Sequence, residues 1–166
     1  MNKINLILII VLSIVILSTS IIIKLYSQNK QNISFPFYIS TKNNEANLRS
    51  GPSKDYPIVL SYNAKNFPLK VIQKHNEWYQ VVDYLNNQGW IYINLTSKKH
   101  SAITINNSTI LYSIANVDSK QIAIIKNNYI VNISHCDNSF FCKITLKYED
   151  TTISGWIEKK DLWGID

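Results

Sequence analysis

The sequence Asn47-Leu48-Arg49-Ser50-Gly51-Pro52-Ser53 decides the fold of the first half of the chain. Side chains alternate along a strand, so Leu48 is expected to point into a core while Arg49 points outward. Gly51 and Pro52 then predict a tight turn, because glycine lacks a Cβ and proline fixes φ. This stretch therefore predicts a strand that ends in a sharp turn.

Two further motifs follow, Trp78-Tyr79-Gln80-Val81 and Gly89-Trp90-Ile91. Gly89 would let two backbones approach closely where a strand begins. Trp78 and Trp90 would each supply a large apolar ring to a small core. Other short runs nearby are rich in β-branched and aromatic residues, with turn residues between them. Short strands at this spacing predict an all-β barrel or sandwich.

The same pattern returns in the second half of the chain. The matching pairs are Leu48 with Leu111, Phe67 with Tyr129, Trp78-Tyr79-Gln80-Val81 with Phe141-Cys142-Lys143-Ile144, and Gly89-Trp90-Ile91 with Gly155-Trp156-Ile157. We therefore expect two modules, at residues 38–95 and 105–166, joined by a linker at 96–104. Domains this small bury too little surface to be very stable alone, so two would gain from packing together or from a covalent link.

In these motifs the chain resembles the bacterial SH3-like domain family, over about residues 38–166. The second module departs from the pattern, since Thr109-Ile110-Leu111-Tyr112-Ser113 lacks the Arg-Ser-Gly-Pro turn. Its closing stretch, from Gly155 to Ile165, looks like the carboxyl end of a two-module exported subgroup of this family. The resemblance implies two small SH3-like β-barrels in tandem. It also implies a binding module, because members are often associated with cell-wall peptides or other envelope partners.

The amino-terminal segment from Ile4 to Ile23 is almost unbroken apolar chain without a charge. At 1.5 Å per residue it is long enough to cross the hydrocarbon core of a membrane. A cleaved signal peptide is the alternative, with Ser18-Thr19-Ser20 as the cleavage site. We expect residues 1–23 to be this anchor or signal and 24–37 a linker. The rest would lie outside the inner (cytoplasmic) membrane on a single-pass tether, or be periplasmic or secreted after cleavage.

The two cysteines, Cys136 and Cys142, flank an Asp-Asn-Ser turn between two β-like runs. A disulfide closing this hairpin is the favoured interpretation in an oxidising compartment. Free thiols, or a nucleophile or metal site that uses the adjacent His135, are the alternatives. The remaining histidines, His75 and His100, are isolated in the sequence. No cofactor, metal or catalytic residue is therefore assigned.

The net charge of +6 could suggest nucleic acid, but its distribution argues against that partner. Residues 38–95 carry six basic against four acidic side chains, and residues 105–166 carry six against seven. The other positive charges lie near the apolar segment or in the predicted linker. Motifs of hydrolases and phosphate-binding loops are also missing from the sequence. We therefore expect neither nucleic-acid binding nor enzymatic activity.

The best candidate binding surface lies in the first module. It comprises Arg49, Asp55, Tyr56, Tyr79 and Tyr92, which could line a shallow groove for an extended peptide or glycan. Trp78 and Trp90 could join this surface, but we expect them in the core. The second module, which lacks the turn, would mainly support the first.

These features favour a non-catalytic envelope protein whose modules recognise cell-wall peptide or an envelope protein partner. Two other functions fit the same sequence. One is a degenerate or accessory component of a cell-wall hydrolase system. The other is a structural subunit of a membrane complex, with its aromatic side chains buried against a partner.

Overall fold

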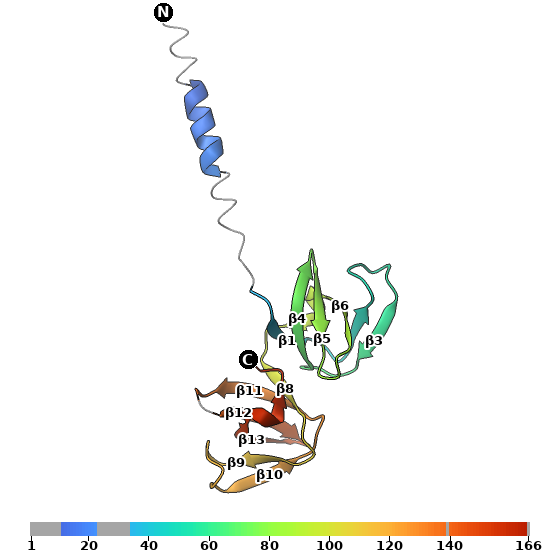
Figure 1. Ribbon diagram of the computed structural model, residues 1–166, viewed down its shortest axis with the longest axis vertical. Helices are drawn as coiled ribbons and strands as arrows, with labels where there is room; N and C mark the ends of the chain where they lie inside the picture. The colour runs from blue at the N-terminus through green and yellow to red at the C-terminus, as the bar shows by residue number, and fades with distance from the viewer. Residues whose placement is uncertain (1–10, 23–33, 139, 166) are drawn as a thin grey trace, which may run out of the picture. The chain divides into compact units, whose positions relative to one another are not determined.

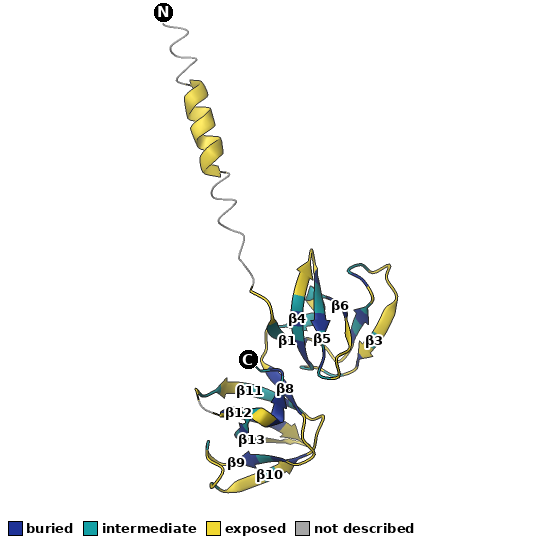
Figure 2. Cartoon of the chain, in the orientation of Figure 1, coloured by how far each residue is buried: buried dark blue, intermediate teal, exposed yellow. Residues whose placement is uncertain are grey.

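A computed structural model describes residues 11–22, 34–138 and 140–165. The chain divides into two units, Met1–Ser34 and Phe35–Asp166. Residues 11–22 are helical, and their side chains are exposed (Figures 1 and 2). Within the described ranges, no helix is both long enough and apolar enough to cross a membrane. Part of the predicted 4–23 segment and most of the predicted 24–37 linker lie outside the described residues, so these two assignments stay predictions.

The first sheet has seven strands in the order β3-β2-β6-β5-β4-β1-β7. A short 3-10 helix, η1 (Ile93–Leu95), precedes the last of them. The strands are β1 (Phe37–Thr41), β2 (Ala46–Arg49), β3 (Ile58–Tyr62), β4 (Pro68–His75), β5 (Trp78–Val82), β6 (Gln88–Tyr92) and β7 (Thr96–Ser97). Neighbouring strands run antiparallel throughout.

The second sheet repeats this arrangement, with the order β10-β9-β13-β12-β11-β8-β14. Its strands are β8 (Ser101–Thr104), β9 (Thr109–Tyr112), β10 (Gln121–Ile125), β11 (Ile130–Cys136), β12 (Phe141–Tyr148), β13 (Thr151–Glu158) and β14 (Leu162–Trp163), with η2 (Lys159–Asp161) before β14. The predicted all-β fold class is confirmed, and each half of the duplicated pattern has a sheet of its own (Figure 1). We call residues 37–97 the first module and residues 101–163 the second.

The linker predicted at residues 96–104 is too long. Thr96 and Ser97 form β7, which pairs with β1, and Ser101–Thr104 forms β8, which pairs with β11. All four residues of β8 are buried. The prediction failed because half of this strand is Ser or Thr, so its burial does not appear as an apolar pattern in the sequence. The connection between the sheets is therefore only residues 98–100.

Each module has its own apolar core, in which the predicted Leu48 and Leu111 are fully buried. The glycines of the two Gly-Trp-Ile motifs pack directly on these leucines. A Cβ added at Gly89 would lie 2.7 Å from Leu48 Cγ, and one added at Gly155 would lie 2.7 Å from Leu111 Cγ. The close backbone approach expected at Gly89 is therefore present in both modules.

The assignment of Trp90 to the core is wrong, and the same holds for its counterpart Trp156, which the repeat would place in the core of the second module. In β6 the buried residues are Gly89 and Ile91, so alternation along the strand turns Trp90 to the opposite face, where it is half-buried. Trp156 in β13 is half-buried for the same reason. Both rings lie on the outer surface of their sheets.

One threonine in each module joins the first strand to the turn before the fourth. Thr41 Oγ1 donates to the carbonyl of Ala64 (2.6 Å) and accepts from the backbone N–H of Phe67 (2.9 Å). Thr104 Oγ1 donates to the carbonyl of Lys126 (2.6 Å) and accepts from the N–H of Tyr129 (3.0 Å). The two modules thus share this polar contact as well as their apolar core.

Candidate functional site

The outer face of β2, β6 and β5 brings several predicted residues together. Arg49 and Gln80 both pair with Trp90 across the sheet, and Trp78 pairs with Tyr92. Directly paired residues in antiparallel strands lie on the same face. We call this set, Arg49, Trp78, Gln80, Trp90 and Tyr92, the outer aromatic face.

Trp78 forms the buried base of this face. Its side chain is only 8% exposed, yet it does not belong to the apolar core cluster of the module. Its ring packs on Tyr92 with centroids 5.4 Å apart. Lys54 Nζ lies 5.9 Å from the Tyr92 ring centroid, a cation–π distance. The Tyr92 hydroxyl is 3.4 Å from Glu77 Oε2. Aromatic surface is therefore held rigidly beside two charged groups.

Arg49 holds the turn that follows its strand. Its guanidinium Nη1 donates to the Tyr56 carbonyl at 2.6 Å. The Tyr56 ring covers Gly51 so closely that a Cβ there would lie 2.6 Å from ring atoms, yet Tyr56 stays 47% exposed. Asp55 instead accepts a hydrogen bond from Ser53 Oγ at 2.8 Å. A guanidinium has five N–H donors, so Arg49 keeps donors for a ligand.

Tyr79 does not belong to the candidate surface. It pairs with Ile91, which is buried, and its ring packs edge-on against Phe37 with centroids 5.7 Å apart. Two other residues lie on the outer side instead. One is Trp90, which we expected in the core, and the other is His75, whose ring centroid lies 6.3 Å from that of Trp90. Strict alternation around Gly89 would have placed Trp90 correctly.

In the second module, different side chains occupy the equivalent positions of this face. Tyr112 pairs with Trp156, as Arg49 pairs with Trp90, and Tyr112 is only 5% exposed. The ring of Tyr112 packs edge-on against Phe141, which occupies the Trp78 position. Glu158 stands where the first module has Tyr92 and pairs with Lys160 Nζ at 2.9 Å. This hydrogen bond raises the pKa of Lys160.

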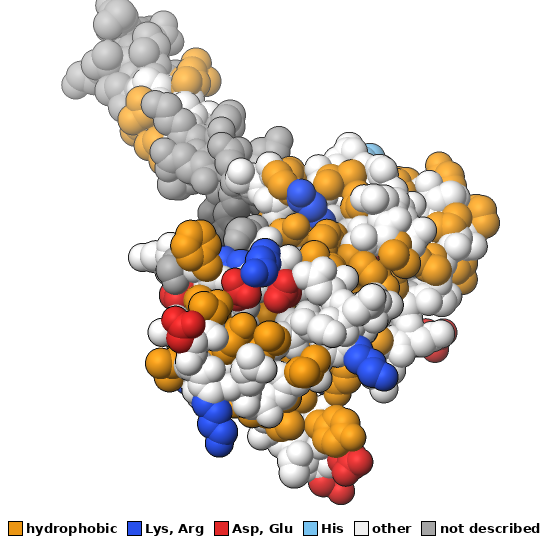
Figure 3. All heavy atoms as spheres, turned by 60° about the horizontal axis from the view of Figure 1, so that its bottom comes forward, with side chains coloured by type: hydrophobic (Ala, Val, Ile, Leu, Met, Phe, Trp, Pro, Cys, Tyr) orange, Lys and Arg blue, Asp and Glu red, His pale blue; other side chains and the backbone are white. Residues whose placement is uncertain are grey.

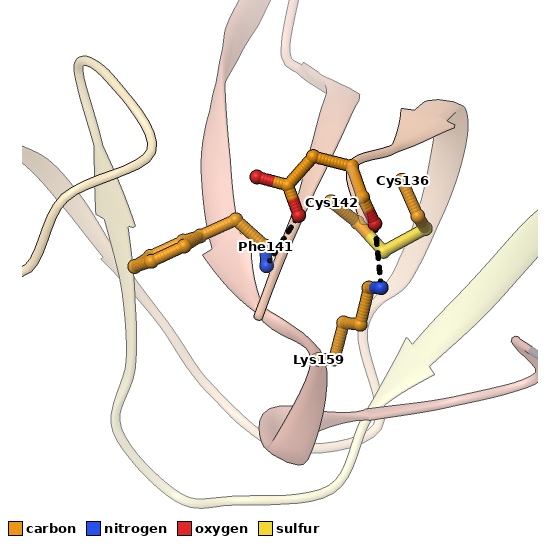
Figure 4. Close-up of a disulfide and its surroundings, with 5 residues drawn as sticks. Cys136, Phe141, Cys142 and Lys159 are labelled. Carbon is orange, nitrogen blue, oxygen red and sulfur yellow. Dashed lines mark hydrogen bonds between the residues drawn. A yellow bond between two sulfur atoms is a disulfide. The ribbon is translucent and has the colours of Figure 1, made fainter. Parts of the chain in front are cut away.

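The predicted disulfide between Cys136 and Cys142 is present (Figure 4). The two residues pair directly across the β11–β12 hairpin. Asp137 stabilises the turn, since its Oδ1 accepts from the Phe141 N–H (3.1 Å) and its carbonyl accepts from Lys159 Nζ (2.7 Å). Both sulfurs are consumed in the bond, so neither cysteine is a free thiol. Among the described residues, no group of three or more His, Cys, Asp or Glu could hold a metal ion.

Comparison with known proteins identifies the first module. Residues 42–98 match the family model of the bacterial SH3 domain, so this part of the chain is similar to that family. No curated protein matches the chain.

Among the solved structures that are similar to the chain are three at 12% identity. They are NlpC2 of Trichomonas vaginalis (TM-score 0.34, covering 80% of this chain and 49% of that chain), NlpC1 of the same organism (0.35, 80% and 47%) and an NlpC/P60 family protein of Bacillus cereus ATCC 10987 (0.32, 76% and 55%). The chain thus spans about half the length of the structures it matches.

Proposed function

We propose that the protein is a non-catalytic envelope protein whose outer aromatic face binds cell-wall peptide. The observation that carries this proposal is the Arg49–Trp90 pair on the first module, where the second module has a buried tyrosine. The bacterial SH3 match covers the same module.

The chemistry of this face suits an extended peptide with free carboxylates. The remaining N–H groups of Arg49 can donate to a carboxylate, and Lys54 adds a second positive charge at the same side. The half-buried rings of Trp90 and Tyr92 offer flat apolar surface for peptide or sugar. The surface is shallow, so affinity should be weak, on the order of micromolar to millimolar.

A membrane tether would make such weak binding effective. The apolar segment at residues 4–23 supports an anchor in the inner membrane, with the modules on the outer side. The disulfide supports an oxidising compartment. A tether raises the local concentration of binding site near the wall. A reporter that works only in the cytoplasm can be fused after Asp166. Activity of this reporter would contradict the placement of the modules outside the membrane.

Purified peptidoglycan provides the direct test. The full chain should sediment with it, and the double variant Arg49→Ala and Trp90→Ala should retain about one tenth of the affinity or less. Trp156→Ala is the matched control, because it removes the equivalent ring from the second module. Equal losses in both variants would contradict binding at the outer aromatic face. Release of soluble wall fragments during the incubation would contradict the non-catalytic assignment.

A further inference from the structure

The second module contains an apolar groove at a place that the first module fills. In the first module, Tyr62 stacks on Phe67 with centroids 4.7 Å apart and donates to Asp83 Oδ2 at 3.2 Å. In the second module, Ile125 ends β10 as Tyr62 ends β3, and Leu146 is the sixth residue from the start of β12, as Asp83 is from the start of β5. The phenol and the carboxylate are both replaced by smaller or apolar groups. A groove of about 520 Å³ opens here.

The groove borders the edge of a strand rather than one face of the sheet. Three consecutive residues of β10, Ala123, Ile124 and Ile125, line the groove together with the following Lys126. Successive side chains of a strand point to opposite faces, so a groove that touches three strand residues in a row reaches the backbone edge. β10 is the end strand of its sheet, and among the described residues no strand pairs with its outer edge. Leu146 and Tyr148, two residues apart in β12, also line the groove.

The side chains around this edge are apolar and exposed. Ile122 is 42% exposed, Ile124 is 67% exposed and Tyr148 is 57% exposed, while Ile125 and Leu146 form a buried floor. Figure 3 turns the end of the molecule that carries β10 forward and shows hydrophobic side chains interspersed with separate charged ones. An exposed apolar edge strand is a template for another strand.

We propose that β10 binds an extended apolar peptide of a partner protein by strand addition, with acidic residues at the ends of the peptide. The exposed lysines Lys120 and Lys126 flank the strand at its two ends. They are complementary to a peptide whose apolar run lies between two carboxylates. Backbone hydrogen bonds would supply affinity, and alternate apolar side chains would fill the groove over Ile125 and Leu146. This site is separate from the outer aromatic face and gives the second module a binding role of its own.

The same lysines disfavour a second copy of this chain as the occupant. If two β10 strands paired antiparallel about Ala123, Lys120 of one copy would lie opposite Lys126 of the other. Like charges directly opposite each other destabilise a strand pair. Lysines at the ends of an edge strand are a common means of preventing self-association.

Hydrogen–deuterium exchange of the full chain with a synthetic peptide tests the proposal. The probe is the acetylated and amidated sequence Asp-Val-Thr-Val-Thr-Val-Asp, added to about 1 mM because strand addition is weak. Exchange should slow in β10 and stay unchanged in β3, the equivalent strand of the first module. A peptide with lysines in place of aspartates should bind about tenfold more weakly. A peptide with proline at its centre should not bind, because proline cannot donate to the ladder.

Two surface variants complete the test. Ile124→Lys should weaken binding about tenfold, while Val59→Lys, at a 53% exposed position of β3, should leave it unchanged. Both variants should melt as the parent does, since neither side chain is buried. The proposal is overturned if β10 is not protected at saturating peptide, or if the two variants behave alike. Protection of β10 that rises with protein concentration, without peptide, would assign the groove to a second copy instead.

Discussion

The first module carries Arg49 at the position where the second carries Tyr112. This difference distinguishes the outer faces of the two sheets. Arg49 is half-buried, bonds the turn at Tyr56 and pairs with Trp90. Tyr112, at the equivalent position, is buried against Phe141. At the ends of β3 and β10 the first module is the closed one. Tyr62 and Asp83 are hydrogen-bonded there, whereas the second module has its apolar groove.

This comparison shows which positions the fold requires and which it leaves free. Leu48 and Leu111, Gly89 and Gly155, and Thr41 and Thr104 make matching contacts in both modules. Outward positions of the same strands differ in charge and size. A duplicated sheet can therefore keep one architecture while each copy presents a different surface, since function is carried by sites and not by the fold.

The largest effect should follow from placing a side chain at the shared glycines. Gly89→Val would bring its Cβ within 2.7 Å of Leu48 Cγ and 2.8 Å of the Arg49 carbonyl oxygen, and Gly155→Val creates the same conflict in the second module. Overpacking against backbone should lower the free energy of unfolding by about 3 kcal/mol in either module. Thermal unfolding followed by circular dichroism would measure it. If only one of the two variants is destabilised, the modules do not share this contact.

The next effect should separate the modules. Asp83 is 2% exposed and accepts from Leu85 N–H, Asn87 N–H and Asn87 Nδ2, each at 2.9 Å, as well as from Tyr62. Asp83→Ala leaves these donors unpaired and should cost about 2–3 kcal/mol. The matched control, Leu146→Ala, should leave the first module intact, as residue-resolved hydrogen exchange would show.

High pH should weaken the first module through the same network. Burial, and secondarily the charge of Asp83, raise the pKa of Tyr62 above its ordinary value of 10.0. The folded pKa exceeds the unfolded one, so this stabilisation is complete below pH 10 and is lost as the pH rises above it. Ile125 gives the second module no such dependence. The difference in free energy of unfolding between the parent and Tyr62→Phe should therefore be smaller at pH 11 than at pH 9.

Much of the fold could be predicted from the sequence because its signals are local. The Gly-Trp-Ile motifs, the Leu48 and Leu111 positions and the cysteine hairpin each depend on neighbours along one strand or turn. The error at Trp90 came from treating a large ring as core without applying alternation around Gly89 and Ile91. The buried strand Ser101–Thr104 escaped detection because its polar side chains carry no apolar pattern.

The candidate sites were harder to predict because they depend on pairing between distant strands. Tyr79 and Tyr92 look equivalent in the sequence, yet the register places Tyr79 beside Ile91 on the core side and Tyr92 beside Trp78 on the outer side. The groove beside β10 lies where Ile125 and Leu146 take the places of Tyr62 and Asp83, whose side chains hydrogen-bond to each other in the first module. Neither relation can be obtained from one strand alone.

Reduction of the disulfide should affect the second module alone. Cys136 and Cys142 close a short loop, and its opening should cost about 2 kcal/mol through the greater entropy of the unfolded chain. The double variant Cys136→Ser and Cys142→Ser should show the same loss without reductant. Hydrogen exchange in β11 and β12 should accelerate, while β4 and β5 remain protected. Equal acceleration in both modules would show that their stabilities are coupled.

The smallest expected effect is the most informative about function, because it exchanges one side chain between the modules. Arg49→Tyr places the second module's residue opposite Trp90 on the outer aromatic face, as Tyr112 lies opposite Trp156, and removes the guanidinium donors. Strand pairing is unaffected, and only the bond to the Tyr56 carbonyl is lost, at about 1 kcal/mol. Affinity for peptidoglycan should fall about tenfold, or about 1.4 kcal/mol, while the fold persists. Tyr112→Arg is the reciprocal control, and it should expose Phe141 without creating binding, since the second module has Glu158 where the first has Tyr92. Full binding by Arg49→Tyr in a sedimentation assay would show that the ligand is held elsewhere on the first module.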